Sequence, residues 1–108
     1  MALKSLGKVT VTTAGTPVRA TLNESTPTAR YAVQSLSVQA LAGNSGTNIY
    51  VGNSAMNKST LAGVFAIVPK GSTASAVIIQ APAGILANEI YLDADTNGDA
   101  ALVSATEQ

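Results

Sequence analysis

Residues 35–40, Ser-Leu-Ser-Val-Gln-Ala, decide the fold class because apolar and polar side chains alternate along the whole stretch. Successive side chains of a β-strand point to opposite faces, so this alternation predicts a strand with one buried and one solvated face. Similar alternating or short strand-like patterns predict strands at 9–12, 18–22, 48–52, 90–95 and 100–104. A helical period is not sustained over ten residues anywhere, and only residues 54–61 are expected to form a turn of helix.

Two further segments are apolar on both faces. They are Val-Phe-Ala-Ile-Val at 64–68 and Ala-Val-Ile-Ile at 76–79, separated by a turn at 69–72, Pro-Lys-Gly-Ser. Strands of an antiparallel sheet commonly keep one wet face, so these two need a second cover. A loop or the N-terminal arm could supply that cover, but in so short a chain another subunit is favoured. The candidate interface residues are Val64, Phe65, Ile67, Val77 and Ile79, together with Leu3 and Leu6.

About eight short strands, with turns at intervals of roughly 8–12 residues, are typical of a β-sandwich or a small barrel. We therefore expect an all-β fold, an antiparallel β-sandwich of jelly-roll-like order. No internal repeat or second domain is visible. Residues 1–8 are expected to form an N-terminal arm and residues 9–108 a single domain.

The composition excludes several function classes. The chain has 108 residues, no Cys, His or Trp, and six basic against six acidic residues, for a net charge of zero. Without Cys the chain cannot form disulfides, and without Cys and His it lacks the usual ligands of zinc, copper and iron. Without His it also lacks the commonest general base. The balanced charge gives no attraction to nucleic acid or to anionic lipid. We expect no cofactor, no catalytic residue and no small-molecule substrate, and hence a protein that is not an enzyme.

One short motif carries the chemistry of a site. Residues 93–99, Asp-Ala-Asp-Thr-Asn-Gly-Asp, match the first seven positions of a calcium loop, with candidate ligands Asp93, Asp95, Asn97 and Asp99. Position 12 of such a loop should be Glu, but here it is Ser104, and the flanking segments look like strands. The competing interpretation is a tight hairpin at Asn97-Gly98, and it is preferred over bound calcium.

Aromatic residues leave one binding function to consider. Tyr50 and Tyr91 each lie in an Ile-Tyr-aliphatic strand and point opposite to its core residues, so they could form an outward sugar-binding pair. Ordinary sheet aromatics would look the same in sequence. Interleaved basic and aromatic residues, which would indicate nucleic-acid binding, are not seen.

No targeting or spanning segment is expected. The N-terminus has a lysine but no apolar core of a signal peptide after it. The longest apolar run, residues 61–68, is much shorter than the roughly 18–20 residues that span a bilayer. Synthesis in the cytoplasm of the producing cell is therefore expected.

Three segments resemble small β-sandwich virion proteins of tailed bacteriophages. They are residues 43–54 (Gly-Asn-Ser-Gly-Thr-Asn-Ile-Tyr-Val-Gly-Asn-Ser), residues 68–71 (Val-Pro-Lys-Gly) and the closing Ile-Tyr-Leu-Asp-Ala-Asp of 90–95. The likeness covers residues 36–104, about two-thirds of the chain. It implies a head decoration, or cement, protein on the capsid surface of the virion, a dimer or trimer whose partners are the major capsid protein and its own copies. A tail, neck or fibre component and a carbohydrate-binding β-sandwich module are the alternatives.

Overall fold

The computed structural model describes residues 3–71 and 77–107, and for 77–79 and 81–83 it describes the strand path alone. Over these residues the chain forms eight strands and one short 3₁₀-helix. Their bounds are β1 (Leu3–Thr10), β2 (Val18–Arg19), β3 (Ala32–Ala40), β4 (Asn48–Asn57), β5 (Ala62–Pro69), β6 (Val77–Leu86), η2 (Ala87–Glu89), β7 (Tyr91–Ala94) and β8 (Ala100–Glu107). In this part of the chain no helix is long and apolar enough to cross a bilayer.

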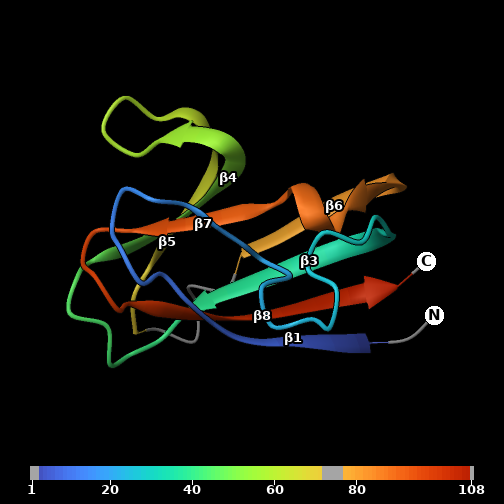
Figure 1. Ribbon diagram of the computed structural model, residues 1–108, viewed down its shortest axis with the longest axis horizontal. Helices are drawn as coiled ribbons and strands as arrows, with labels where there is room; N and C mark the ends of the chain where they lie inside the picture. The colour runs from blue at the N-terminus through green and yellow to red at the C-terminus, as the bar shows by residue number, and fades with distance from the viewer. Residues whose placement is uncertain (1–2, 72–76, 108) are drawn as a thin grey trace.

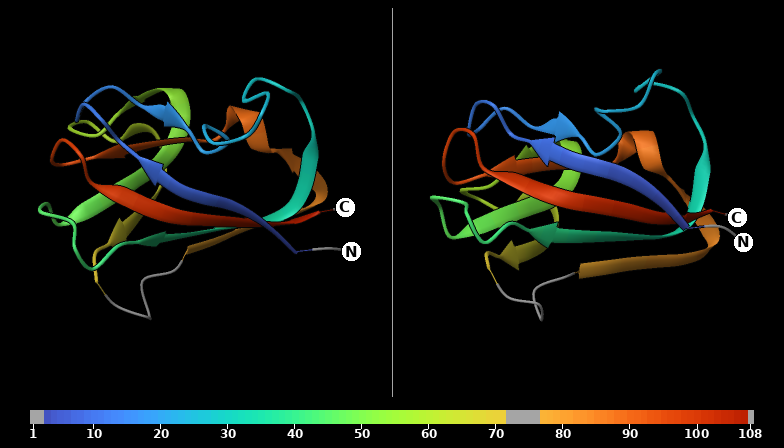
Figure 2. Two further views of the ribbon diagram at one scale, coloured as in Figure 1. Left: turned by 60° about the horizontal axis from the view of Figure 1, so that its bottom comes forward. Right: turned by 90° about the horizontal axis from the view of Figure 1, so that it is seen from below.

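The strands form two four-stranded antiparallel sheets, which pack face to face (Figures 1 and 2). The first sheet has the order β1-β8-β3-β6 and the second β2-β7-β4-β5. Strands pair from the two ends of the chain inward, β1 with β8, β2 with β7, β3 with β6 and β4 with β5. The predicted all-β, antiparallel β-sandwich is confirmed.

The core lies between the sheets and is built from the apolar half of each alternating strand. Leu36 and Val38 of β3 belong to the same buried cluster as Ile49 and Val51 of β4, and all four side chains are fully buried. Burying a side chain of this size contributes about 1.5–3 kcal/mol. The alternation at 35–40 therefore corresponds to a strand with one buried face, as the sequence predicts, because its apolar side chains lie in the core between the two sheets.

The N-terminal segment belongs to the first sheet. The arm expected over residues 1–8 is, from Leu3 onward, the first part of β1, which pairs with β8 from Leu3↔Thr106 to Thr10↔Ala100. A bulge at Gly7, whose φ is +80°, shifts the register once along this pair. Figure 1 shows the start of β1 and the end of β8 lying at the same end of the sandwich.

The helical turn expected at residues 54–61 is wrong. β4 instead continues to Asn57, and a turn over residues 58–61 leads into β5. The side chain of Asn53 accepts a hydrogen bond from the amide of Ala55, and that of Asn57 accepts from Ser59 and Thr60. Such local side-chain acceptors compete with helical hydrogen bonds and favour turns, which explains the difference.

The hairpin expected at Asn97-Gly98 is also wrong. β7 and β8 lie in different sheets, so residues 95–99 cross from one sheet to the other. The turn bonds to the segment after β1: the amide of Gly98 donates to the carbonyl of Val11, and the amide of Ala14 donates to the side chain of Asn97. These long-range bonds replace the cross-strand pairing that an Asn-Gly turn usually closes.

β4 curls strongly beyond Gly52 and folds back with the start of β5, as Figure 1 shows. At the curl the two main chains nearly touch. A Cβ placed on Gly52 would lie 2.2 Å from the carbonyl oxygen of Gly63 and 3.1 Å from the sulfur of Met56. Gly63 itself has a φ of +73°, and a Cβ there would lie 2.5 Å from Asn53 Oδ1. Only glycine fits both positions.

Gly52→Ala should therefore destabilise the protein by roughly 2–3 kcal/mol or more, since the clash is with main chain that cannot turn aside. Urea unfolding followed by circular dichroism measures the effect. Gly43→Ala is the matched control, because a Cβ on Gly43 meets nothing within 4 Å. Equal unfolding midpoints for the two variants would show that the crossing is not a tight constraint.

Candidate functional site: the β5 edge surface

β5 is the outer strand of the second sheet and exposes large apolar side chains. Phe65 is 58% exposed and Ile67 41% exposed, while Val68, on the opposite face of the strand, is fully buried. Leu61, in the turn before β5, is 48% exposed and has a φ of +66°. We call Leu61, Phe65 and Ile67 the β5 edge surface. A branched apolar residue held in the left-handed region is strained, and such strain often marks a functional position.

The main chain of β5 also has an open side. The amide of Lys70 donates to the carbonyl of Thr47, and Ile67 lies opposite Tyr50 in the same ladder. Bonded and non-bonded pairs alternate in an antiparallel ladder, so the amide and carbonyl of Ile67 point away from β4. A bulge lies next to Phe65, between the pairs Val51↔Ala66 and Gly52↔Val64.

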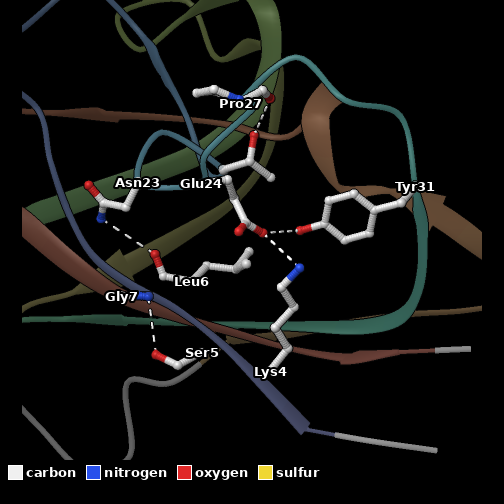
Figure 3. A network of polar contacts seen from close by, with 9 residues as sticks. Lys4, Ser5, Leu6, Gly7, Asn23, Glu24, Pro27 and Tyr31 are labelled. Atoms are coloured by element: carbon white, nitrogen blue, oxygen red, sulfur yellow. Dashed lines mark hydrogen bonds and ion pairs between the residues drawn. The ribbon is translucent and has the colours of Figure 1, made fainter.

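The edge of the first sheet at β1 is protected in a way that β5 is not. Asn23 donates from its side-chain amide to the main-chain carbonyl of Leu6 (Figure 3) and to that of Lys8, and both carbonyls lie along the free side of β1. Lysines on this strand add charge, a common protection against edge-to-edge association. β5 carries no charged residue between Ala62 and Pro69. The contrast makes β5 the better candidate for contact with another protein.

Lys4, Glu24 and Tyr31 form a compact polar cluster that ties β1 to the loop before β3 (Figure 3). Glu24 Oε1 lies 3.0 Å from Lys4 Nζ and accepts a hydrogen bond from Tyr31 Oη at 2.7 Å. The ammonium of Lys4 also lies 4.5 Å from the centre of the Tyr31 ring.

The hydrogen bonds from Tyr31 and Lys4 lower the pKa of Glu24. Burial, followed by the bond to Glu24, raises the pKa of Tyr31. A tyrosine that acts as a base needs the opposite shift, so the cluster is interpreted as a clamp.

The residues proposed for an interface from the sequence differ in their exposure to solvent. Phe65, Ile67 and Leu3 are exposed, and Val64 is half-buried. Leu6 is only 3% exposed and belongs to the core cluster, so its selection as an interface residue is wrong: the bulge at Gly7 leaves Leu6 on the inner face. The side chains of Val77 and Ile79 lie outside the described residues.

The aspartates of residues 93–99 hold loops in place. Asp93, which is 1% exposed, accepts from the amides of Gly15 and Ala94. Asp95 accepts from Tyr50 Oη, and Asp99 accepts from the amides of Ser45 and Gly46, both at 2.8 Å. No group of three or more acidic residues that could hold a metal is present among the described residues.

The two tyrosines proposed as a sugar platform share the outer face of the second sheet but do not form an open pair. Tyr50 lies opposite Asp93, and Tyr91 lies opposite Gly52. Tyr50 is 9% exposed, and burial together with its bond to Asp95 raises its pKa. The guanidinium of Arg19 covers the Tyr91 ring at 5.1 Å. With one ring buried and the other covered by a guanidinium, the two tyrosines do not form a paired sugar platform.

Sequence reasoning missed the Lys4–Glu24–Tyr31 cluster and the pairing of Arg19 with Tyr91. The members of the second pair are 72 residues apart and meet only because β2 lies beside β7. A local pattern carries no signal for such contacts. Comparisons of the chain with protein-family models, curated proteins and solved structures gave no match.

Glu24→Gln should lower the stability at neutral pH by about 1 kcal/mol, because the variant loses the ion pair and weakens the bond from Tyr31. The folded-state pKa of Glu24 lies below its ordinary value of 4.5. The stabilisation that its carboxylate contributes is therefore fully present above pH 4.5 and is lost as the pH falls through the folded-state pKa. The wild type and the variant should therefore converge in stability below that range. Urea unfolding at several pH values measures the difference, with Glu89→Gln, an exposed site, as control.

Calcium should leave the melting temperature unchanged relative to a chelator, because the carboxylates of 93–99 already accept main-chain amides from separate loops. Differential scanning calorimetry in excess calcium and in EDTA tests this expectation. A rise in melting temperature that saturates with calcium would restore the calcium interpretation of the motif.

Proposed function

We propose that this chain is a non-enzymatic structural protein that decorates the outside of a tailed-phage capsid and associates with its own copies through the β5 edge surface. The observation that carries the proposal is β5 itself, an uncharged edge strand that exposes Phe65 and Ile67. Exposed apolar side chains next to an open strand edge are a common basis for association between proteins. The resemblance of residues 36–104 to phage virion proteins gives the class of assembly.

The outer face of the first sheet supports a second contact, with the capsid shell. Its central cross-strand row is Ser5, Ser104 and Ser37, in register from β1 through β8 to β3. The next row includes Leu102, which is 45% exposed and lies between Lys8 and Gln39. The serine row and Leu102 can approach a protein surface closely, and Lys8 is the one charged residue in these two rows.

A protein with these two surfaces would stabilise a shell by mass action. It would bind the assembled lattice, where several capsid subunits meet, in preference to the separated subunits. Oligomerisation would multiply weak contacts, because each further contact in a linked set is intramolecular. The major capsid protein and further copies of this chain are the proposed partners, and the virion surface is the proposed location.

A tail, neck or fibre role would use the same surfaces, and the place of the protein in the virion separates these roles. The carbohydrate-module alternative is less well supported, because Tyr50 is shielded and Arg19 covers Tyr91. Purified virions should show this protein by mass spectrometry and extra density on the head by electron microscopy. Density confined to the tail would contradict the decoration proposal while leaving self-association intact.

Self-association predicts that the double variant Phe65→Ser/Ile67→Ser is monomeric where the wild type is a dimer or trimer. Both side chains point outward, so the melting temperature should change little. Light scattering after size exclusion gives the mass. Leu22→Ser is the matched control. Leu22 has nearly the same exposed fraction as Ile67, 43% against 41%, but lies in a loop away from β5. A wild type that is monomeric at high concentration would refute self-association through β5.

A further inference from the structure

A cavity of about 310 Å³ lies at the outer face of the second sheet, between the β4 curl and η2. Its walls include Arg19 of β2, Arg30 of the loop before β3, Tyr91 of β7, and Asn88 and Glu89 of η2. This volume lies at the small end of the range of ligand sites and suits a molecule of the size of one sugar ring. The cavity is separate from the β5 edge surface, and the proposed function does not use it.

Arg19 is held in place by two contacts. Its guanidinium donates a hydrogen bond to the main-chain carbonyl of Asn88 and stacks on the ring of Tyr91. An arginine has five N–H donors in a rigid planar group, so others remain for a ligand. Because the group is already ordered, a ligand that binds it would lose little further side-chain entropy.

The two arginines of the cavity are not neutralised by an ion pair. Among the described residues the one ion pair joins Lys4 and Glu24, so neither Arg19 nor Arg30 lies within ion-pair distance of Glu89. Two guanidinium groups against one carboxylate leave a local excess of positive charge. The planar guanidinium of each arginine matches the geometry of a carboxylate, which it can bind through two N–H groups.

Uncharged polar residues complete the cavity wall. Asn88 lines the cavity, is 7% exposed, and donates weakly from its Nδ2 to the carbonyl of Thr28 at 3.5 Å. Asn53 and Ser54, on the β4 curl, place further polar groups on the opposite wall.

We propose that this cavity binds a carboxylate with neighbouring hydroxyl groups, the chemistry shared by small hydroxy acids and acidic sugars. Arg19 and Arg30 bind the carboxylate. Hydroxyl groups donate to the carboxylate of Glu89 in η2, which is exposed and lines the cavity. Neutral sugars lack the group that the arginines recognise, and simple apolar acids lack the donors that η2 accepts.

The test is a titration followed by amide signals in NMR spectra of the full chain at constant ionic strength. The probes are D-glucuronate, lactate and, as a neutral control, glucose. Glucuronate or lactate should give saturable shifts at Asn53, Ser54 and residues 88–91, while glucose gives none. Stronger binding of glucuronate identifies an acidic sugar as the ligand source, and equal binding of lactate identifies a small hydroxy acid.

Arg30→Gln should weaken the binding of either acid by roughly fivefold or more, because it removes one charge-assisted contact. Arg30 is exposed, so the variant should fold normally. Lys8→Gln removes the same charge from another exposed position and should leave the affinity unchanged. The proposal is overturned if neither acid gives saturable shifts, if glucose binds equally well, or if both variants behave as the wild type does. None of these results bears on oligomerisation through β5.

Discussion

The close crossing of two main chains at Gly52 and Gly63 is the constraint on which both candidate surfaces depend. It lets β4 leave the plane of the second sheet and return as β5, with only a carbonyl oxygen between the strands at that point. The curl carries Asn53 to the wall of the arginine cavity and leaves Leu61 exposed at the turn. A side chain at position 52 would push β5 outward and disturb the edge and the cavity together.

The fold class could be predicted because it depends on local patterns that the core then uses. Alternation at 35–40 and 90–95 places every second side chain inside, and the structure buries Leu36, Val38 and Leu92 as expected. Strand pairing between the chain ends was not predictable in the same way, because many pairings satisfy the same alternation. The turn at Asn97-Gly98 shows the limit: its local preference is for a hairpin, but bonds to Val11 and Ala14 hold it as a crossing between sheets.

The sequence could indicate only the part of the candidate site that lies in an unusually apolar segment. The segments at 64–68 and 76–79 are both uncharged and apolar on both faces, which distinguishes them from the other expected strands, and in the first of them Phe65 and Ile67 are exposed. The aspartates of 93–99 show the opposite case. Their spacing imitates a calcium loop, but in the folded chain Asp93 and Asp99 accept from amides of two different loops and Asp95 accepts from Tyr50 of β4. Spacing therefore indicates which groups are near one another, while the tertiary structure decides which partners they take.

Charge is distributed differently over the two proposed binding surfaces of this protein. Lys4 and Glu24 form an ion pair at the β1 edge, and the carboxylates of Asp93 and Asp99 accept hydrogen bonds from loop amides. The β5 strand stays uncharged, which lets it approach another protein without desolvation of ions. The excess positive charge of the outer face then lies with Arg19 and Arg30, away from β5. Because the two surfaces use different interactions, salt should weaken the arginine cavity while leaving apolar association at β5 largely intact.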